Sequence, residues 1–246
     1  MLTTTENSIR SLSSENGEII LNGLASTQLV LKHLYESGNG QFSRKDLLDD
    51  LMKLGKISEQ IKSENYLGEK MKIFFSEYQI LSNKLKTKYS DLLPSRVIEK
   101  LEAGEKYTEG LKKLLSAQSY MIQAFDDKDI VSQAEKLYTG MVKVSEILES
   151  YISYFPEELI KIVNNAALQI LADRYLQPEQ SALPTAAINY LIALKNTTRS
   201  LLWQIENYQK DKKYTVGELL DWLETAPSWV GDDFEECLEY VNRVRK

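Results

Sequence analysis

Apolar residues recur at spacings of three and four along nearly the whole chain after residue 17, and the strict alternation of a half-buried strand is scarce. This period places apolar side chains along one face of an α-helix. Stretches rich in proline, glycine or aspartate interrupt the pattern and mark turns. The sequence therefore predicts an all-α fold, an elongated antiparallel bundle of long heptad-patterned helices.

Three segments carry apolar residues at alternating spacings of four and three, the repeat of a heptad seam. The spacing predicts helices over residues 58–89, 94–125 and 130–155, the last entered through the turn Asp126–Asp129. Short connections favour antiparallel neighbours, and such seams also leave a homo-oligomer open. The seam residues are Leu67, Met71, Phe74, Tyr78, Leu81 and Leu85, then Tyr107, Leu111, Leu114, Met121 and Phe125, then Ala134, Leu137, Met141, Val144, Leu148, Tyr151 and Phe155.

Local signals predict shorter helices on both sides of these three segments. A helix over Glu18–Ser37 should be closed by Gly38, and a second should begin at Ser43, capped together with Asp46, and end at Gly55. Two more are expected over residues 156–176, apolar on several sides and therefore central, and over residues 185–208. The resulting regions are an N-terminal tail (1–17), a small helical unit (18–57), a bundle core (58–213) and an acidic C-terminal helical pair (214–246).

The composition predicts a cytoplasmic protein that does not span a membrane. The chain has 246 residues and a net charge of −6, which argues against whole-protein attraction to nucleic acid or anionic lipid. No apolar run approaches the ~18 residues that a membrane span needs, and the first fourteen residues lack the apolar core of a signal peptide. The single cysteine, Cys237, cannot form an internal disulfide, which fits a reducing compartment.

Candidate catalytic chemistry is sparse, so the sequence predicts no catalytic residue, metal ligand or cofactor. His33 is the only histidine and is expected on a helix surface, while Cys237 lies among glutamates that would raise the pKa of its thiol. The stretch Asp232–Glu236 matches a relaxed form of the Asp-Asp-x-x-Glu magnesium motif of all-helical isoprenoid synthases, and Asp126–Asp129 lacks its last acid. Helix capping explains both clusters, although a magnesium-dependent enzyme stays an alternative.

A nucleic-acid-associated regulator is a second alternative. Three helices separated by tight turns between Glu18 and Tyr89 could form a unit like a helix-turn-helix, and residues 53–90 carry eight lysines against four glutamates. Lys84, Lys86 and Lys88 would form its basic patch. The first turns of the third helix offer no arginine, however, and a solvated helix face is the favoured explanation of the lysines.

The C-terminal segment is the most distinctive part of the chain. From residue 215 to 246 there are eight acidic and three basic residues, which is −5 of the total charge of −6. Aromatic side chains among charged groups are typical of a docking element, and the acidic field would attract a basic partner protein. The alternative is that these aromatics pin the last helix onto the bundle. The expected contact residues are Trp229, Asp232, Asp233, Phe234 and Glu236.

The ten residues Trp229–Leu238 also resemble a tail found on small cyanobacterial proteins of the antitoxin type. The resemblance implies a cyanobacterial source and a tail that contacts another protein. No part of residues 1–210 shares it. The sequence thus favours a non-catalytic adaptor or regulatory subunit that docks a partner protein through its acidic C-terminal segment.

Overall fold

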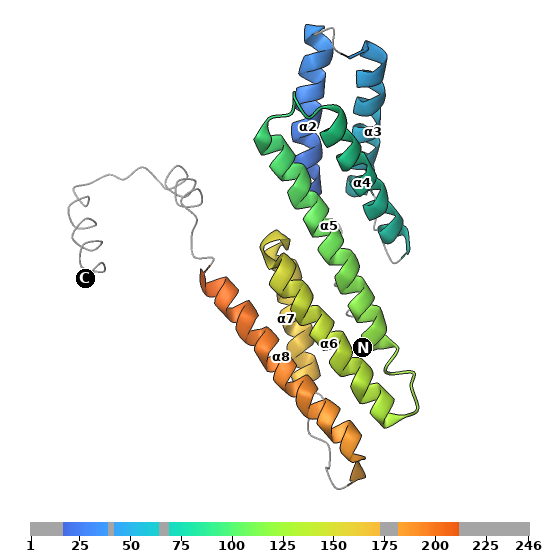
Figure 1. Ribbon diagram of the computed structural model, residues 1–246, viewed down its shortest axis with the longest axis vertical. Coiled ribbons are helices and arrows are strands. Elements are labelled where there is room, and N and C mark those ends of the chain that lie inside the picture. Colours follow the sequence, from blue (N-terminus) through green and yellow to red (C-terminus); the bar gives the residue numbers. More distant parts are fainter. Residues whose placement is uncertain (1–16, 39–41, 64–68, 173–181, 212–246) are drawn as a thin grey trace, which may run out of the picture. The chain divides into compact units, whose positions relative to one another are not determined.

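The computed structural model describes residues 17–38, 42–63, 69–172 and 182–211, and within these ranges it contains α-helices, one short 3-10 helix and no strand (Figure 1). The all-α prediction is therefore confirmed. The chain divides into two units, residues 1–205 and 206–246, and most of the second lies outside the described ranges. The elements are α2 (Glu18–Ser37), α3 (Arg44–Ser63), α4 (Glu69–Lys88), α5 (Ser95–Ile122), α6 (Ile130–Tyr151), η1 (Ile152–Tyr154), α7 (Glu157–Ala172) and α8 (Thr185–Asp211).

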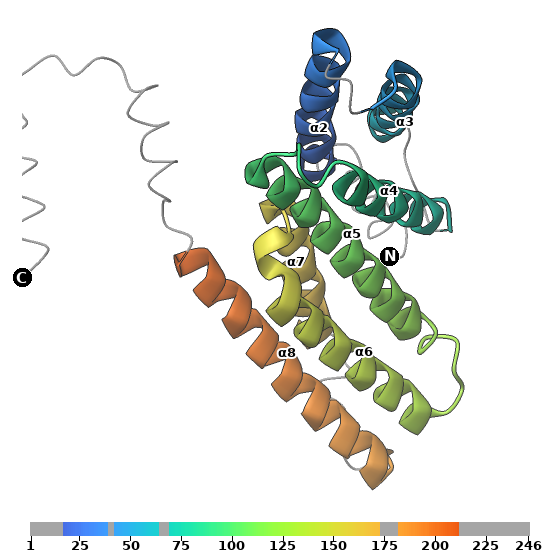
Figure 2. The same cartoon turned by 45° about the horizontal axis from the view of Figure 1, so that its top comes forward.

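Helix α5 is the hub of the described helices. It packs against α2, α4, α6 and η1, while α2 also packs against α3 (Figures 1 and 2). Helix α8 reaches α6 through the rings of Tyr190 and Tyr138, whose centroids are 6.1 Å apart. None of the helices in the described part of the chain combines the length and the apolar character needed to cross a membrane.

The predicted heptad seams form the core. In α6 every seam residue is buried except Val144, which is half-buried, and Phe155 after η1 is 2% exposed. The seam of α4 is buried from Phe74 to Leu85, and four of the five seam residues of α5 are buried. The exception is Phe125, which is 55% exposed because α5 ends at Ile122. Leu67 lies outside the described residues.

Two predicted helix ends are confirmed by their backbone geometry. Gly38 closes α2 in the left-handed region, with φ of 63°, where a residue with a Cβ would be strained. At the start of α3, the Asp46 amide donates to Ser43 Oγ at 3.1 Å, and Ser43 Oγ donates to Asp46 Oδ2 at 2.7 Å. The capping pair read from the sequence is therefore present.

The predicted helix boundary at Gly55 and Ser58 is wrong, because α3 runs without a break from Arg44 to Ser63. Leu54 and Ile57 are buried on either side of the glycine. Their burial outweighs the cost of roughly 1 kcal/mol that a glycine adds inside a helix. The expected long helix over residues 58–89 is instead divided between α3 and α4.

The helix expected over residues 156–176 is present as α7, within the described residues, but the expectation that it is central is wrong. In helix α7 only Leu159, Ile160 and Ala167 are buried. Leu168 is 47% exposed, and several other apolar side chains of the helix are half-buried. The helix is therefore peripheral, although its composition is that of a core element.

Glycines allow α5 to come close to its neighbours. The hydroxyl of Tyr78 on α4 occupies the space that a Cβ on Gly104 would need, and it donates to Leu101 O at 3.1 Å. A Cβ on Gly110 would lie 2.7 Å from the ring of Phe155 and 2.9 Å from that of Tyr151. Each glycine is thus a contact point between helices rather than a weak point of α5.

Candidate functional site

The predicted partner-binding residues of the C-terminal segment lie outside the described part of the chain. These residues are Trp229, Asp232, Asp233, Phe234 and Glu236. Their role stays a prediction. The described helices contribute a buried ionic cluster, surface apolar side chains and an open depression.

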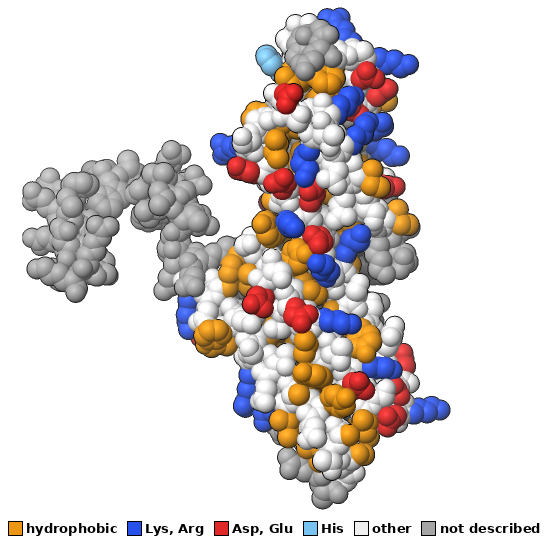
Figure 3. Space-filling view, in the orientation of Figure 1, with side chains coloured by type: hydrophobic (Ala, Val, Ile, Leu, Met, Phe, Trp, Pro, Cys, Tyr) orange, Lys and Arg blue, Asp and Glu red, His pale blue; other side chains and the backbone are white. Residues whose placement is uncertain are grey.

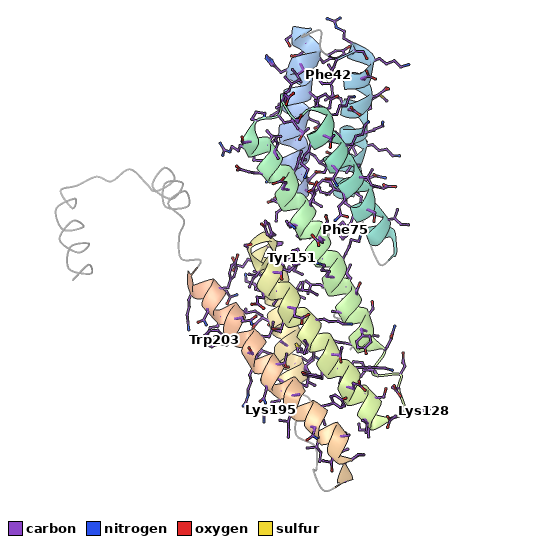
Figure 4. The ribbon with its side chains drawn as sticks, in the orientation of Figure 1. Phe42, Phe75, Lys128, Tyr151, Lys195 and Trp203 are labelled. Atoms are coloured by element: carbon purple, nitrogen blue, oxygen red, sulfur yellow. The ribbon has the colours of Figure 1, made fainter. Side chains whose placement is uncertain are left out.

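The buried ionic cluster centres on Asp50 of α3, which is 1% exposed. Asp50 Oδ1 accepts from Lys84 Nζ at 2.9 Å, and Oδ2 accepts from Lys88 Nζ at 2.7 Å and from the Tyr89 hydroxyl at 3.0 Å. The ring of Phe42, labelled in Figure 4, packs on that of Tyr89 with a centroid distance of 4.9 Å. The carboxylate thereby joins α3 to the end of α4.

The donors around Asp50 keep it charged. Burial alone would raise the pKa of the Asp50 carboxyl, but the hydrogen bonds from Lys88, Lys84 and Tyr89 outweigh burial and leave the pKa below its ordinary value. Burial acts to lower the pKa of Lys88, yet its hydrogen bonds to Asp50 and Tyr89 raise that pKa above the ordinary value. Burial raises the pKa of the Tyr89 hydroxyl. At neutral pH the cluster is therefore a carboxylate held by two ammonium groups and a neutral phenol.

The three lysines of the predicted basic patch all take part in ion pairs between helices. Lys84 and Lys88 bind Asp50, while Lys86 on α4 lies 2.8 Å from Glu105 and 3.7 Å from Glu102 on α5. The side chain of Lys86 is 18% exposed. The paired carboxylates offset the positive charge that would attract phosphate. The described contacts are those of a structural network.

A similar contact joins α5 to α6, where Lys113 Nζ donates to the Tyr151 hydroxyl at 2.6 Å and lies over the Tyr151 ring (Figure 4). Figure 3 shows acidic and basic side chains interspersed over this face of the described helices, in agreement with the nearly balanced charge before residue 215. The polar groups of this region therefore hold helices together.

The acidic turn before α6 has the capping role expected from the sequence. Asp129 accepts from the amides of Val131 and Ser132, and Asp127 accepts from Lys136 Nζ at 2.6 Å. The Lys136 hydrogen bond is the largest of several effects that hold the pKa of Asp127 far below its usual range. His33 is exposed on α2, as predicted. Among the described side chains, no group of three His, Cys, Asp or Glu residues is arranged to hold a metal ion.

Large apolar side chains also lie on the surface of the described helices. Trp203 on α8 is 65% exposed and projects away from the helix bundle (Figure 4). Single exposed apolar residues are ordinary on soluble proteins, so only their grouping carries information. The others above about a third exposure are Leu29, Leu48, Met52, Ile73, Ile80, Ile122, Phe125, Leu168 and Ile192.

An open depression of about 510 Å³ lies along α5 beside η1. Its chemistry is that of carboxylates and one ammonium group, and one of its acids, Glu105, is already paired with Lys86. The depression offers no residue combination that assigns a reaction. Its lining consists of Glu99, Glu102, Ala103, Glu105, Lys106 and Tyr154.

The sequence contains one signal for the Asp50 cluster that the search for apolar seams missed, because Asp50 is an acid at a seam position. The buried positions of α3 are Leu47, Leu54, Ile57 and Ile61, and Asp50 continues the same alternating spacing of three and four. An acid at a seam position must find partners or lose its charge. Its partners, 34 to 39 residues away, could not be inferred from the spacing on α3 alone.

Comparison with protein-family models, with curated proteins and with solved structures found no match to this chain. The side chains of the chain and their contacts therefore carry the functional argument.

Proposed function

We propose that the protein is a non-catalytic adaptor or regulatory subunit, which binds a partner protein with a basic surface through the acidic segment 214–246. Its contact residues would be Trp229, Asp232, Asp233, Phe234 and Glu236. In this proposal, the helices before that segment form the scaffold that carries it.

The uneven distribution of charge is the observation that carries this proposal. Residues 1–214 hold 28 acidic and 27 basic residues, whereas residues 215–246 hold eight and three. A concentrated field of one sign speeds encounter with an oppositely charged surface. Tryptophan and phenylalanine within such a field supply the apolar contact area that charges lack.

The contacts of the described helices support a scaffold role for these helices and a binding role for the C-terminal segment. The lysines of the predicted basic patch are paired with carboxylates of neighbouring helices, as in the contacts of Asp50 with Lys84 and Lys88. These lysines are thus paired within the scaffold, and most of the net charge of the chain lies in the C-terminal segment. No described contact favours the nucleic-acid alternative over this one.

Capture from the native lysate tests the proposal with matched variants. The full chain is compared with Trp229→Ala/Phe234→Ala and with Trp203→Ala, which removes an exposed tryptophan from α8 instead. We expect the same captured protein with the full chain and with Trp203→Ala, and a loss of at least about tenfold with the double variant. Asp232→Asn/Asp233→Asn should weaken the salt dependence of capture. Capture that is unchanged by both C-terminal variants would contradict the proposal.

A further inference from the structure

Helix α8 has a buried face and, on its other side, an exposed strip. The exposed residues Ile192, Arg199 and Trp203 follow one another at spacings of seven and four, so they lie along one line of the helix surface. Lys195, which is half-buried, lies beside this line. We call these four residues the α8 strip. The residues of the buried face are at most 3% exposed and are Leu191, Leu194, Thr198, Leu201 and Ile205.

The α8 strip combines large apolar side chains with basic ones. Trp203 is 65% exposed and Ile192 is 51% exposed. Figure 4 shows Trp203 and Lys195 on the same edge of α8, the edge away from α6. The grouping on one helix face distinguishes these side chains from single exposed apolar residues, which are ordinary on protein surfaces.

The charge of the α8 strip is positive and is not balanced nearby. Residues 182–205 contain two basic residues, Lys195 and Arg199, and no acidic one. Among the described side chains, no carboxylate forms an ion pair with either of them, unlike the lysines of α4. Glu206, the first acid after this stretch, is paired with Lys210 at 2.7 Å. The strip therefore offers an ammonium and a guanidinium group that can bind an outside carboxylate.

We infer that the α8 strip binds an acidic amphipathic helix of a partner protein. Carboxylates of that helix would pair with Lys195 and Arg199, and its apolar side chains would cover Ile192 and Trp203. A guanidinium group binds a carboxylate through two parallel hydrogen bonds. Tryptophan and arginine are also the residues that most often dominate the binding energy of protein interfaces.

The α8 strip gives the proposed adaptor a second binding site of opposite charge. The acidic C-terminal segment suits a basic partner, whereas the strip suits an acidic one, so the two sites select different proteins. The strip lies entirely within the first unit, residues 1–205. The inference therefore does not rest on the proposed function of the C-terminal segment.

Single-stranded nucleic acid is another polyanion that an arginine and a tryptophan can bind. Two cations make a small footprint for phosphate, however, and the whole chain carries a net charge of −6. Bases stack on aromatic rings, and Ile192 provides none. The composition of the strip thus favours a protein partner, and nucleic acid becomes a control in the experiment.

The size of the α8 strip sets the expected strength of binding. The eleven-residue separation of Ile192 and Trp203 corresponds to about 16 Å along the helix. A contact one helix wide over this length is smaller than the roughly 800 Å² that each partner buries in a standard interface. The association should therefore be weak, with a dissociation constant of about 10 to 100 µM.

The fluorescence of Trp203 tests the inference in the full chain with Trp222→Phe/Trp229→Phe, where Trp203 is the only tryptophan left. The probe is a peptide of three heptads with leucine at the a and d positions and glutamate and alanine elsewhere. Its binding should shift the emission to the blue as Trp203 leaves water. A matched peptide with glutamine in place of glutamate should bind at least about tenfold more weakly. Equal binding of the two peptides overturns the inference, and so does an unchanged emission at about 1 mM glutamate peptide.

Two charge-neutralising variants of this chain locate the binding site. Lys195→Gln/Arg199→Gln should weaken binding of the glutamate peptide at least about tenfold, because both carboxylate partners are removed. The control Lys53→Gln/Lys56→Gln makes the same change of charge at exposed positions of α3 and should bind like the parent chain. Equal binding by both variants overturns the inference.

Two further outcomes would assign the α8 strip to a different occupant. A larger change of Trp203 emission with oligothymidine than with the glutamate peptide would assign the strip to nucleic acid. A blue shift that grows with protein concentration alone would assign it to a second copy of the chain. Either result overturns the inference.

Discussion

The α3–α5 region and the α7–α8 region use similar helical patterns in different ways. In the first, the seam of α4 from Phe74 to Leu85 is buried, and the carboxylate of Asp50 is buried and paired with lysines of α4. In the second, α7 has a more apolar composition, yet Leu168 remains 47% exposed and only three of its residues are buried. Apolar periodicity thus indicates which face of a helix is apolar. Whether that face is buried depends on the helices that pack against it.

The difference separates structural charges from exposed apolar surface. Between α3 and α5 the ion pairs join neighbouring helices, so these charges stabilise the scaffold. On α7 and α8 apolar side chains such as Leu168 and Ile192 remain about half exposed. Loss of a group should therefore reduce folding stability strongly in the first region and little at the exposed positions of the second.

The largest loss of stability is expected from Asp50→Ala. This change leaves Lys84, Lys88 and the Tyr89 hydroxyl without their shared acceptor, and the free energy of unfolding should fall by about 3 kcal/mol. Asp50→Leu, which continues the apolar seam of α3, should lose less because leucine fills the buried space that alanine leaves empty. Urea denaturation of the unchanged chain and of both variants measures these free energies of unfolding. A loss below about 0.5 kcal/mol for Asp50→Ala would show that the cluster does not join the helices.

A smaller loss is expected from Gly110→Ala. The new Cβ would crowd the rings of Phe155 and Tyr151, and overpacking of roughly 1–3 kcal/mol is offset by about 1 kcal/mol of helix propensity. We expect a net loss of about 1–2 kcal/mol in the free energy of unfolding. The control is Gly55→Ala, whose Cβ would lie 3.8 Å from its nearest neighbour and should stabilise the chain. Equal effects of the two changes would contradict the described packing around α5.

The pH dependence of stability should depend on Asp50. Because its pKa is lower in the folded chain than the ordinary 3.8, its contribution is complete above that value and is lost as the pH falls through the folded pKa. The difference in unfolding free energy between the unchanged chain and Asp50→Asn should therefore be constant near neutral pH and shrink below about pH 4. Denaturant titrations at several pH values measure it. A difference that grows on acidification has the wrong sign.

The smallest effect is expected on α7. Leu168→Ala should change the free energy of unfolding by less than about 0.5 kcal/mol at micromolar concentration, because the side chain is already half in water. The matched change Leu24→Ala on α2, where the leucine is 0% exposed, should cost about 3 kcal/mol. Thermal unfolding followed by circular dichroism compares the pair. Similar losses would mean that α7 is a core helix after all.

Much of the fold could be predicted from local sequence. Gly38 and the Ser43–Asp46 pair fix helix ends through contacts within a few residues, and the seam of α6 follows its period closely. The prediction that a helix ends at Gly55 is wrong because the burial of the residues beside it depends on tertiary packing. The presence of a glycine gives no information about that packing. The exposure of α7 likewise depends on how many helices pack around it.

The ion pairs were beyond the reach of local signals. Lys84, Lys86 and Lys88 form a positive run in the sequence, but the carboxylates that pair with them come from α3 and α5. A sum of charges along one helix cannot show such pairing. The acidic C-terminal segment is the opposite case, because its net charge of −5 exceeds what its own three basic residues can balance.

The central claim, that residues 215–246 dock a partner and do not complete the core, is tested most directly by the unfolding free energy of a chain that ends at residue 214. The account predicts the same helical signal as the full chain and an unfolding free energy within about 1 kcal/mol. A loss of several kcal/mol, with loss of helical signal, would place the segment in the core and contradict the claim.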